Sequence, residues 1–209
     1  MSLSRRACVL SLPALAMSLG MVGCGDSGLQ LGGSAKPKFT GVDITGVPYA
    51  TGFSLPDGDG KTRTLDEFKG QVVVLFFGYT QCPDVCPTTL AELAKAKQIL
   101  GEDGKRVQGI FVTVDPERDT PEVVKAYSTA FDPSFVGLRP ANTEAVDAVV
   151  KEFKIVYVKA PGSTPGTYTV NHTAASLVFD AQGKPRLYEQ YNVGAEALAK
   201  DLAVLLKQG

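Results

Sequence analysis

The chain has 209 residues, of which 21 are basic and 22 acidic, so its charge is nearly balanced. No run of lysine or arginine is present, which leaves nucleic-acid binding without electrostatic support. The apolar fraction of 44% is that of a globular protein and excludes a chain that is disordered throughout. We expect one folded domain preceded by a targeting segment and a linker.

Residues 1–23 predict an export signal of the lipoprotein type. Arg5 and Arg6 form a charged start, and residues 7–23 carry no charge and are mostly apolar and small. Pro13 interrupts this stretch, which is marginally short for a membrane span and is more typical of a secretion signal. The arginine pair also resembles the start of a twin-arginine signal, which leaves the export route open.

The end of the signal, Met21-Val22-Gly23-Cys24, resembles the bacterial lipoprotein box, in which a small residue precedes the cysteine that receives the lipid. We therefore expect a lipid on Cys24; the alternative is an ordinary signal peptide with Cys24 as a bystander. Residues 24–38 are rich in Gly and Ser, which is typical of a flexible tether. The folded domain is expected over residues 39–209.

The start of this domain predicts short strands. Residues 39–55 contain short apolar stretches broken by Gly and Pro, and residues 57–60 (DGDG) predict a turn. Residues 62–64 can pair back across that turn as a hairpin, with one helical turn following. The continuous apolar run QVVVLFF at residues 71–77 predicts a strand buried on both faces, as in the centre of a parallel sheet.

Helices and strands alternate after this run. The expected elements are a loop at 78–86, a helix from Pro87 to about 100, a strand at 107–114, a helix from Thr120-Pro121 to about 130, a short strand at 135–138 and a helix at 142–153. They continue with a Pro/Gly/Ser loop at 159–167, residues 169–172 leading into a strand at 175–180, its hairpin partner at 186–190 and an amphipathic helix at 195–207. This order predicts a thioredoxin-like α/β domain, with a central sheet flanked by helices.

The cysteines point to chemistry rather than to a structural bridge. Of the four, Cys8, Cys24, Cys82 and Cys86, only the last two belong to the predicted domain. A disulfide between them would close a very small loop, and stabilisation by loop closure grows with loop length. A purely structural disulfide would therefore contribute little.

The cysteine pair predicts a metal site. It follows the central strand, at the edge where α/β sheets hold their ligands, and amides at a helix start favour thiolate. Thiolates are soft ligands, which select Cu(I). Two thiolates leave such an ion under-coordinated, and the only histidine, His172, lies just before a predicted core strand. We expect it to complete the site through neutral imidazole; the alternative is a loop histidine without a ligand role.

Zinc is the chemical rival for two cysteines and one histidine. A structural zinc ion usually takes four protein ligands, and no further Cys or His remains, although Asp84 or water could supply the fourth. Iron–sulfur ligation lacks enough cysteines.

Three segments, GYTQCPDVCP (78–87), VTVDPERDTPEVVKAY (112–127) and VNHTAASLVFD (170–180), together resemble the Sco/SenC family of copper proteins. The resemblance runs from about residue 53 to the C-terminus. It implies a thioredoxin-like fold with an added N-terminal hairpin. It also implies Cu(I) or Cu(II) bound by Cys82, Cys86 and His172, and a role in building the dinuclear copper centre of cytochrome c oxidase subunit II.

This resemblance implies a metallochaperone rather than an enzyme. Its partner would be cytochrome c oxidase subunit II or another copper chaperone, met at the periplasmic face of the inner membrane of a bacterial envelope, where the lipid holds the chain. The alternative is a thiol–disulfide reductase that keeps the partner's cysteines reduced, with Cys82 and Cys86 as its redox pair. A thiol peroxidase is a third reading, which Pro83 disfavours because an activating threonine would be needed there.

Two positions depart from the family pattern. Gln81 stands where many relatives have His, and Asn171 replaces the acid that often precedes the histidine ligand. In the middle segment, Asp115 has a turn or capping role as the alternative to a role in the site. Residues 117–119 are expected to form a local network of ion pairs and caps rather than to take part in the chemistry.

Overall fold

The computed structural model describes residues 38–209, so the predictions about the signal, Cys24 and most of the tether lie outside the described residues. Within residues 38–209, a mixed sheet has the strand order β1-β10-β9-β4-β5-β6. Its strands are β1 (Val42–Asp43), β4 (Val72–Gly78), β5 (Val107–Thr113), β6 (Val136–Leu138), β9 (Ala175–Phe179) and β10 (Pro185–Gln190). Two hairpins stand apart from it: β2 (Ser54–Pro56) with β3 (Thr62–Thr64), and β7 (Tyr157–Pro161) with β8 (Tyr168–His172).

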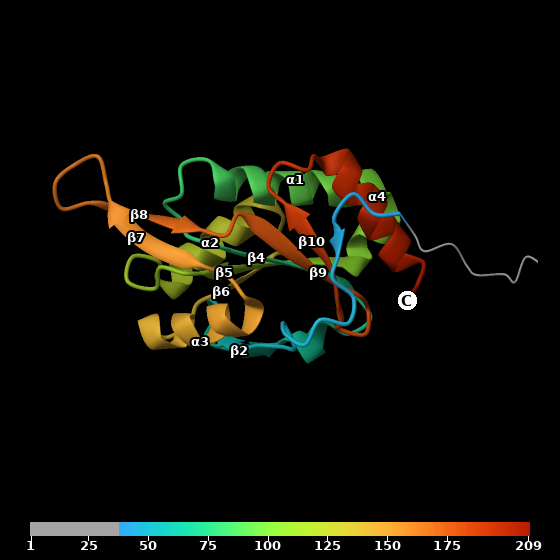
Figure 1. Ribbon diagram of the computed structural model, residues 1–209, viewed down its shortest axis with the longest axis horizontal. Helices are drawn as coiled ribbons and strands as arrows, with labels where there is room; N and C mark the ends of the chain where they lie inside the picture. The colour runs from blue at the N-terminus through green and yellow to red at the C-terminus, as the bar shows by residue number, and fades with distance from the viewer. Residues whose placement is uncertain (1–37) are drawn as a thin grey trace, which may run out of the picture. The chain divides into compact units, whose positions relative to one another are not determined.

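The helices cover both faces of this sheet. They are α1 (Val85–Leu100), α2 (Pro121–Phe131), α3 (Thr143–Phe153) and α4 (Ala195–Leu206), with short 3-10 turns η1 (Leu65–Phe68) and η2 (Gly101–Arg106). Figure 1 shows α1 and α4 above the sheet and α3 below it. Helix α1 packs on α4, and α2 packs on β6 and α1. The predicted order of strands and helices, including the hairpin near the start of the domain, is confirmed except at β7, which was not expected.

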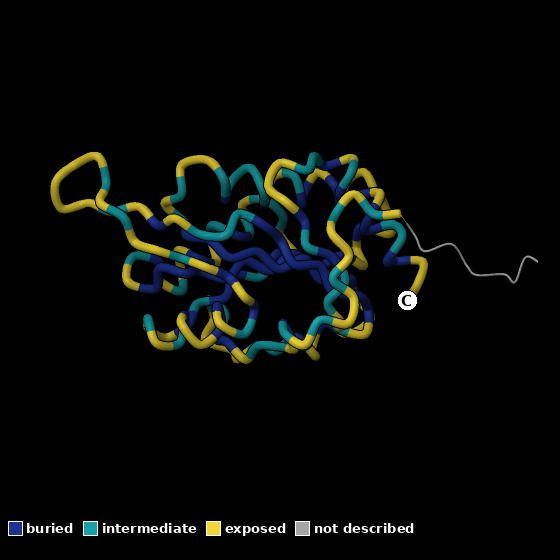
Figure 2. The backbone as a smooth tube through the Cα atoms, viewed as in Figure 1, coloured by how far each residue is buried: buried dark blue, intermediate teal, exposed yellow. Residues whose placement is uncertain are grey.

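The centre of the sheet explains the continuous apolar run. Every residue of β4 and of β5 is buried, because helices cover both faces. The two strands pair in parallel from Val72 opposite Val107 to Gly78 opposite Thr113, with α1 as the crossover. On its other edge β4 pairs antiparallel with β9. Figure 2 shows this buried centre, whose carboxyl end is the edge expected to hold ligands.

Two helices begin where local sequence predicts. The side chain of Thr120 accepts a hydrogen bond from the Val123 amide, and Pro121 occupies the first turn of α2. The side chain of Asn142 accepts from the Ala145 amide at the start of α3. Such caps satisfy backbone donors that have no partner inside the helix, and they fix where each helix starts.

The loop expected at residues 159–167 is partly wrong, because its first residues belong to β7. Tyr157 lies opposite His172 and Pro161 opposite Tyr168, so β7 and β8 form a hairpin that projects from the body of the domain (Figure 1). Most of β7 is exposed on both faces, with Val156 just before it 67% exposed. A strand without a buried face has no alternating apolar pattern, and its Pro and Gly residues are typical of a loop.

None of the helices within residues 38–209 is long and apolar enough to cross a membrane.

Two buried carboxyl groups face each other between β10 and α4. Glu189 and Asp201 are each 2% exposed. The Asp201 carboxylate accepts hydrogen bonds of 2.8 Å from the amides of Thr40 and Gly41, whereas the Glu189 oxygens have no partner while that group is ionised. Burial, and then the charge of Asp201, raises the pKa of Glu189 to about 8. A protonated Glu189 becomes a donor to Asp201, so the pair shares one proton at neutral pH.

Candidate metal centre

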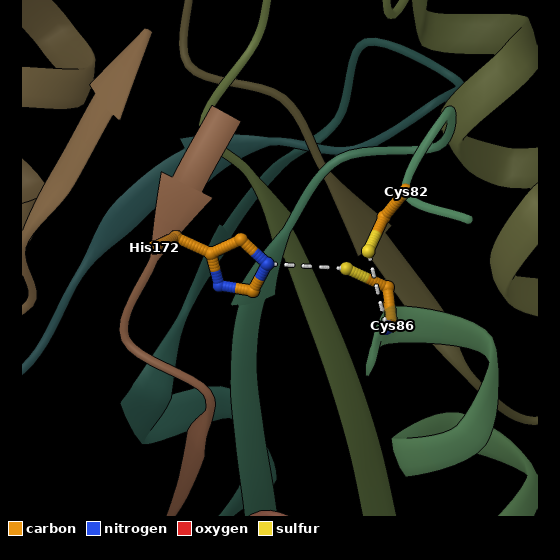
Figure 3. Close-up of side chains that lie close together, drawn as sticks. All are labelled: Cys82, Cys86 and His172. Carbon is orange, nitrogen blue, oxygen red and sulfur yellow. Dashed lines mark hydrogen bonds between the residues drawn. The ribbon is translucent and has the colours of Figure 1, made fainter. Parts of the chain in front are cut away.

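Three separate elements bring Cys82, Cys86 and His172 together at the carboxyl end of β4 (Figure 3). Cys82 lies in the loop after β4, and Cys86 lies in the first turn of α1, which begins at Val85 and not at Pro87 as expected. His172 is the last residue of β8. The two sulfurs and the ring nitrogen all lie within 4.8 Å of one another, with Cys86 Sγ 3.3 Å from His172 Nε2.

Cys86 is tightly packed against the end of β4. Its side chain is fully buried, whereas Cys82 and His172 are partly exposed. A Cβ atom at Gly78 would stand 2.6 Å from Cys86 Sγ, so a residue without a side chain is required there. The strand therefore ends in a glycine because the helix start, with its sulfur, lies directly against the backbone.

The imidazole of His172 is oriented by its neighbours. Its ring packs edge-on against the rings of Phe76 and Tyr79, with centroids 5.8 Å and 6.1 Å away. Nδ1 lies 3.0 Å from the carbonyl oxygen of Thr173. A carbonyl can only accept, so Nδ1 carries the hydrogen, and the lone pair of Nε2 points toward the sulfurs. This is the tautomer that a metal ligand requires.

The two thiols have opposite electrostatic environments. A hydrogen bond from the Cys86 thiol, assisted by the amides of Asp84 and Cys86, lowers the pKa of Cys82 to about 5. The same contact with Cys82, together with burial, raises the pKa of Cys86 well above its usual value. The metal-free pair is therefore one thiolate, Cys82, and one thiol, Cys86, whose single proton lies near both Cys82 Sγ and His172 Nε2.

This asymmetry gives a pH-dependent reactivity. In the reduced, metal-free chain we expect alkylation of Cys82 by iodoacetamide to rise with a midpoint near pH 5, with Cys86 protected by burial. The Cys86→Ala variant removes the S–H donor, so the midpoint should move up by at least about one pH unit. Mass spectrometry of the Cys82 peptide measures both midpoints. An unchanged midpoint in the variant would rule out the thiol hydrogen bond as the cause.

A cavity of about 320 Å³ opens between the Cys82 loop and β8. Cys82 and His172 line it, together with Tyr79 and Asn171, whereas Cys86 does not. Two of the three predicted ligands are thus reachable from solvent, and the third lies behind them.

Two buried carboxylates in the segment after β5 form hydrogen bonds with the elements that carry the site. Asp119 is fully buried and accepts hydrogen bonds from the amide and hydroxyl of Thr80 and from the hydroxyl of Thr113. Asp115, also fully buried, accepts from Arg118 and from the Tyr168 hydroxyl. The expected network at residues 117–119 exists, but its partners are the cysteine loop and the β7–β8 hairpin. Sequence reasoning missed these partners, and the only signal for them was the DPERD motif itself.

The remaining candidates lie outside the cluster. Asp84 is exposed, and its carboxylate accepts from the Thr88 hydroxyl; the group of potential metal-ligating side chains within residues 38–209 does not include it. Asn171 is exposed on β8, on the opposite face from His172. Gln81 Oε1 accepts from Arg118. Two thiols and one imidazole remain, a donor set that suits a soft ion such as Cu(I).

The fold and the site together define a class of protein. It is a thioredoxin-like domain with two cysteines and one histidine placed to bind a metal at the end of the central strand. Within that class, the chain belongs to the SCO1/SenC family, whose model matches residues 43–207. The SCO2-like protein of Rickettsia felis is 36% identical over 159 residues, which cover 75% of this chain and 77% of the relative.

Two solved structures support the same assignment. Apo Sco1 of Thermus thermophilus is 40% identical, with a TM-score of 0.71 over 82% of this chain and 99% of that one. ScoI of Bradyrhizobium japonicum, solved with copper bound, is 36% identical, with a TM-score of 0.67 over 75% of this chain and 99% of that one. The predicted family and fold are confirmed, and the expected cofactor agrees with the copper in that relative.

Proposed function

We propose that this chain is a copper metallochaperone, which binds one copper ion through Cys82, Cys86 and His172 and delivers it to the dinuclear copper site of cytochrome c oxidase subunit II. The observation that carries the proposal is that these three side chains, from a loop, a helix start and a hairpin, place their ligand atoms within 4.8 Å of one another. The copper in the Bradyrhizobium relative and the role of the family support the choice of ion and partner.

The burial of the ligands favours release by exchange. Cys86 carries its proton in the metal-free pair, so binding of copper releases that proton to solvent. Cys82 and His172 face the cavity, so ligands from a partner could replace them one at a time while the buried Cys86 still holds the ion. Copper would then leave without passing through water as a free ion.

The N-terminal part of the chain sets the place of this transfer. We propose that residues 1–23 are a lipoprotein signal, that Cys24 bears the lipid and that residues 24–38 tether the domain at residues 39–209. The box Met21-Val22-Gly23-Cys24 supports this anchor. At the periplasmic face of the inner membrane of a bacterium, the domain could reach subunit II or another copper chaperone.

A thiol–disulfide reductase is the second candidate, favoured by the low pKa of the accessible Cys82. The Cys82 thiolate would attack a disulfide of the partner and form a mixed disulfide, releasing one partner thiolate. Cys86 would then lose its proton, attack Cys82 Sγ and release the second partner thiolate. The partner disulfide is reduced and the Cys82–Cys86 pair is oxidised; His172 is not required.

Anaerobic loading of the full chain with one equivalent of Cu(I), followed by copper X-ray absorption, separates the two functions. The metallochaperone requires one retained copper with two sulfur ligands and one nitrogen ligand. Loss of all copper through gel filtration, with a reversible Cys82–Cys86 disulfide in the same sample, would instead establish the reductase. Displacement of the copper by equimolar zinc would contradict the choice of metal.

A further inference from the structure

The hairpin that carries His172 has no backbone pairing with the central sheet. Strands β7 and β8 pair only with each other among residues 38–209. The thiols, in contrast, stand on the loop after β4 and on the first turn of α1. The chain ties His172 to β9 through two residues, and side chains that bridge hairpin and sheet must hold the rest of the hairpin in place.

Arg118 is a side chain that contacts both the hairpin and the cysteine loop. On the hairpin, its Nη1 donates a 2.9 Å hydrogen bond to the carbonyl oxygen of Tyr168. Its guanidinium carbon also lies 3.7 Å from the centroid of the Tyr168 ring. The hydroxyl of Tyr168 donates a 2.7 Å bond to Asp115, whose carboxylate also accepts from Arg118 Nε. Arg118 and Asp115 thus hold the first residue of β8 by its backbone carbonyl, its ring and its hydroxyl.

The same guanidinium reaches the cysteine loop. Nη1 also donates to Gln81 Oε1 at 3.2 Å, and Gln81 immediately precedes Cys82. The guanidinium carbon stands 5.5 Å from the ring centroid of Tyr79, the ring that packs edge-on against His172. The Tyr79 hydroxyl oxygen interacts with the backbone amide of Val170. Val170 lies two residues before His172, on the inward face of β8. The guanidinium of Arg118 therefore contacts both the hairpin that carries His172 and the loop that carries Cys82.

The electrostatics of this contact require an arginine. The Asp115 side chain is fully buried, and that of Arg118 is 21% exposed, so the ion pair lies largely away from water. A guanidinium can stack on Tyr168 while its edge donates to a carboxylate, a carbonyl and an amide at once. A lysine ammonium could pair with Asp115, but it could not stack and donate in one plane.

We propose that Arg118 is a positioning residue that fixes the β7–β8 hairpin against the cysteine loop, so that His172 Nε2 faces the two sulfurs. The proposal rests on the copper-binding function and deepens it. Arg118 does not contact the ligand atoms, so it acts by orienting the hairpin that carries His172.

The test is the Cu(II) affinity of the full-length chain carrying Arg118→Met, measured by competition with a chromophoric chelator. The affinity is expected to fall about 10- to 100-fold, as for other residues that orient a metal ligand. Arg118→Lys should recover only a small part of it. The reduction potential of the Cys82–Cys86 disulfide should not change, because His172 takes no part in that bond.

A double-mutant cycle shows whether Arg118 acts through the imidazole. In a His172→Ala background, Arg118→Met is expected to cause no further loss of Cu(II) affinity. An equal loss in both backgrounds would overturn the proposal, and so would a wild-type affinity in the single variant. A wild-type chain that binds no copper would overturn the proposed function together with this inference. That result differs from the two above, in which the wild type binds copper.

Two further variants separate positioning from folding. Asp115→Asn combined with Arg118→Met removes the buried unpaired charge that the single variant leaves, and should show the same loss of Cu(II) affinity. Arg186→Met is the matched control, because Arg186 is similarly covered and bonds to Asp180, Thr45 and Gln208. It is expected to keep the wild-type Cu(II) affinity; a loss there equal to that of Arg118→Met would overturn the proposal.

Discussion

The His172→Ala variant is expected to lose at least about 100-fold in Cu(II) affinity, because removing a ligand should cost no less than removing a residue that merely orients one. His172 Nε2 is the only nitrogen in the three-residue cluster found within residues 38–209. The two thiols do not depend on it, so the Cys82–Cys86 disulfide should still form and be reduced normally. Competition with a chromophoric chelator measures the affinity, and thiol titration measures the disulfide.

The neighbouring strand provides the control for this variant. Val158→Ala changes the same hairpin, but its side chain is 56% exposed and does not line the cavity that Cys82 and His172 face. We expect it to bind Cu(II) as the wild type does. If His172→Ala also kept the wild-type affinity, the three-ligand site would be wrong, and the two cysteines alone would have to account for any metal bound.

The Glu189→Gln variant is expected to stabilise the domain at alkaline pH. Burial and the charge of Asp201 raise the pKa of Glu189 from 4.5 to about 8, so the folded state binds the extra proton between these values. The contribution of Glu189 to stability should therefore fall as pH rises from about 4.5 and level off above about 8, with a loss of about 3 kcal/mol by neutral pH. A neutral amide keeps a donor toward Asp201 and removes this slope.

Urea unfolding of the reduced, metal-free chain across this pH range measures the effect. At pH 5 the variant should match the wild type within about 1 kcal/mol, because Glu189 is then protonated. At pH 8.5 it should be more stable by about 4 kcal/mol. Glu196→Gln removes one charge from an exposed position of α4 and should change neither value. Equal pH slopes in wild type and Glu189→Gln would show that the buried pair does not share a proton.

The sequence predicted most of the fold because its main signals are local. The run at residues 71–77 is apolar throughout because β4 is covered on both faces. The starts of α2 and α3 were visible in Thr120 and Asn142, whose side chains cap their own helices. The cysteines were placed correctly because they follow a recognisable central strand.

Other features depend on contacts between distant parts of the chain, which the sequence does not display. Strand β7 is stabilised by pairing with β8 rather than by a buried face of its own, so its residues read as a loop. Glu189 looks like a surface acid until α4 brings Asp201 against it. The bridging role of Arg118 was invisible for the same reason, since Tyr168 lies 50 residues further along the chain.

The separation of the hairpin from the sheet has a mechanical consequence. With an ion bound, Cys86 and His172 become a cross-link between positions 86 residues apart. If the metal-bound chain were pulled from its ends, the closed loop would keep about 300 Å of polypeptide from being extended. Loss of the ion would open that loop, so under the proposed function the chain would become easier to extend when it transfers copper.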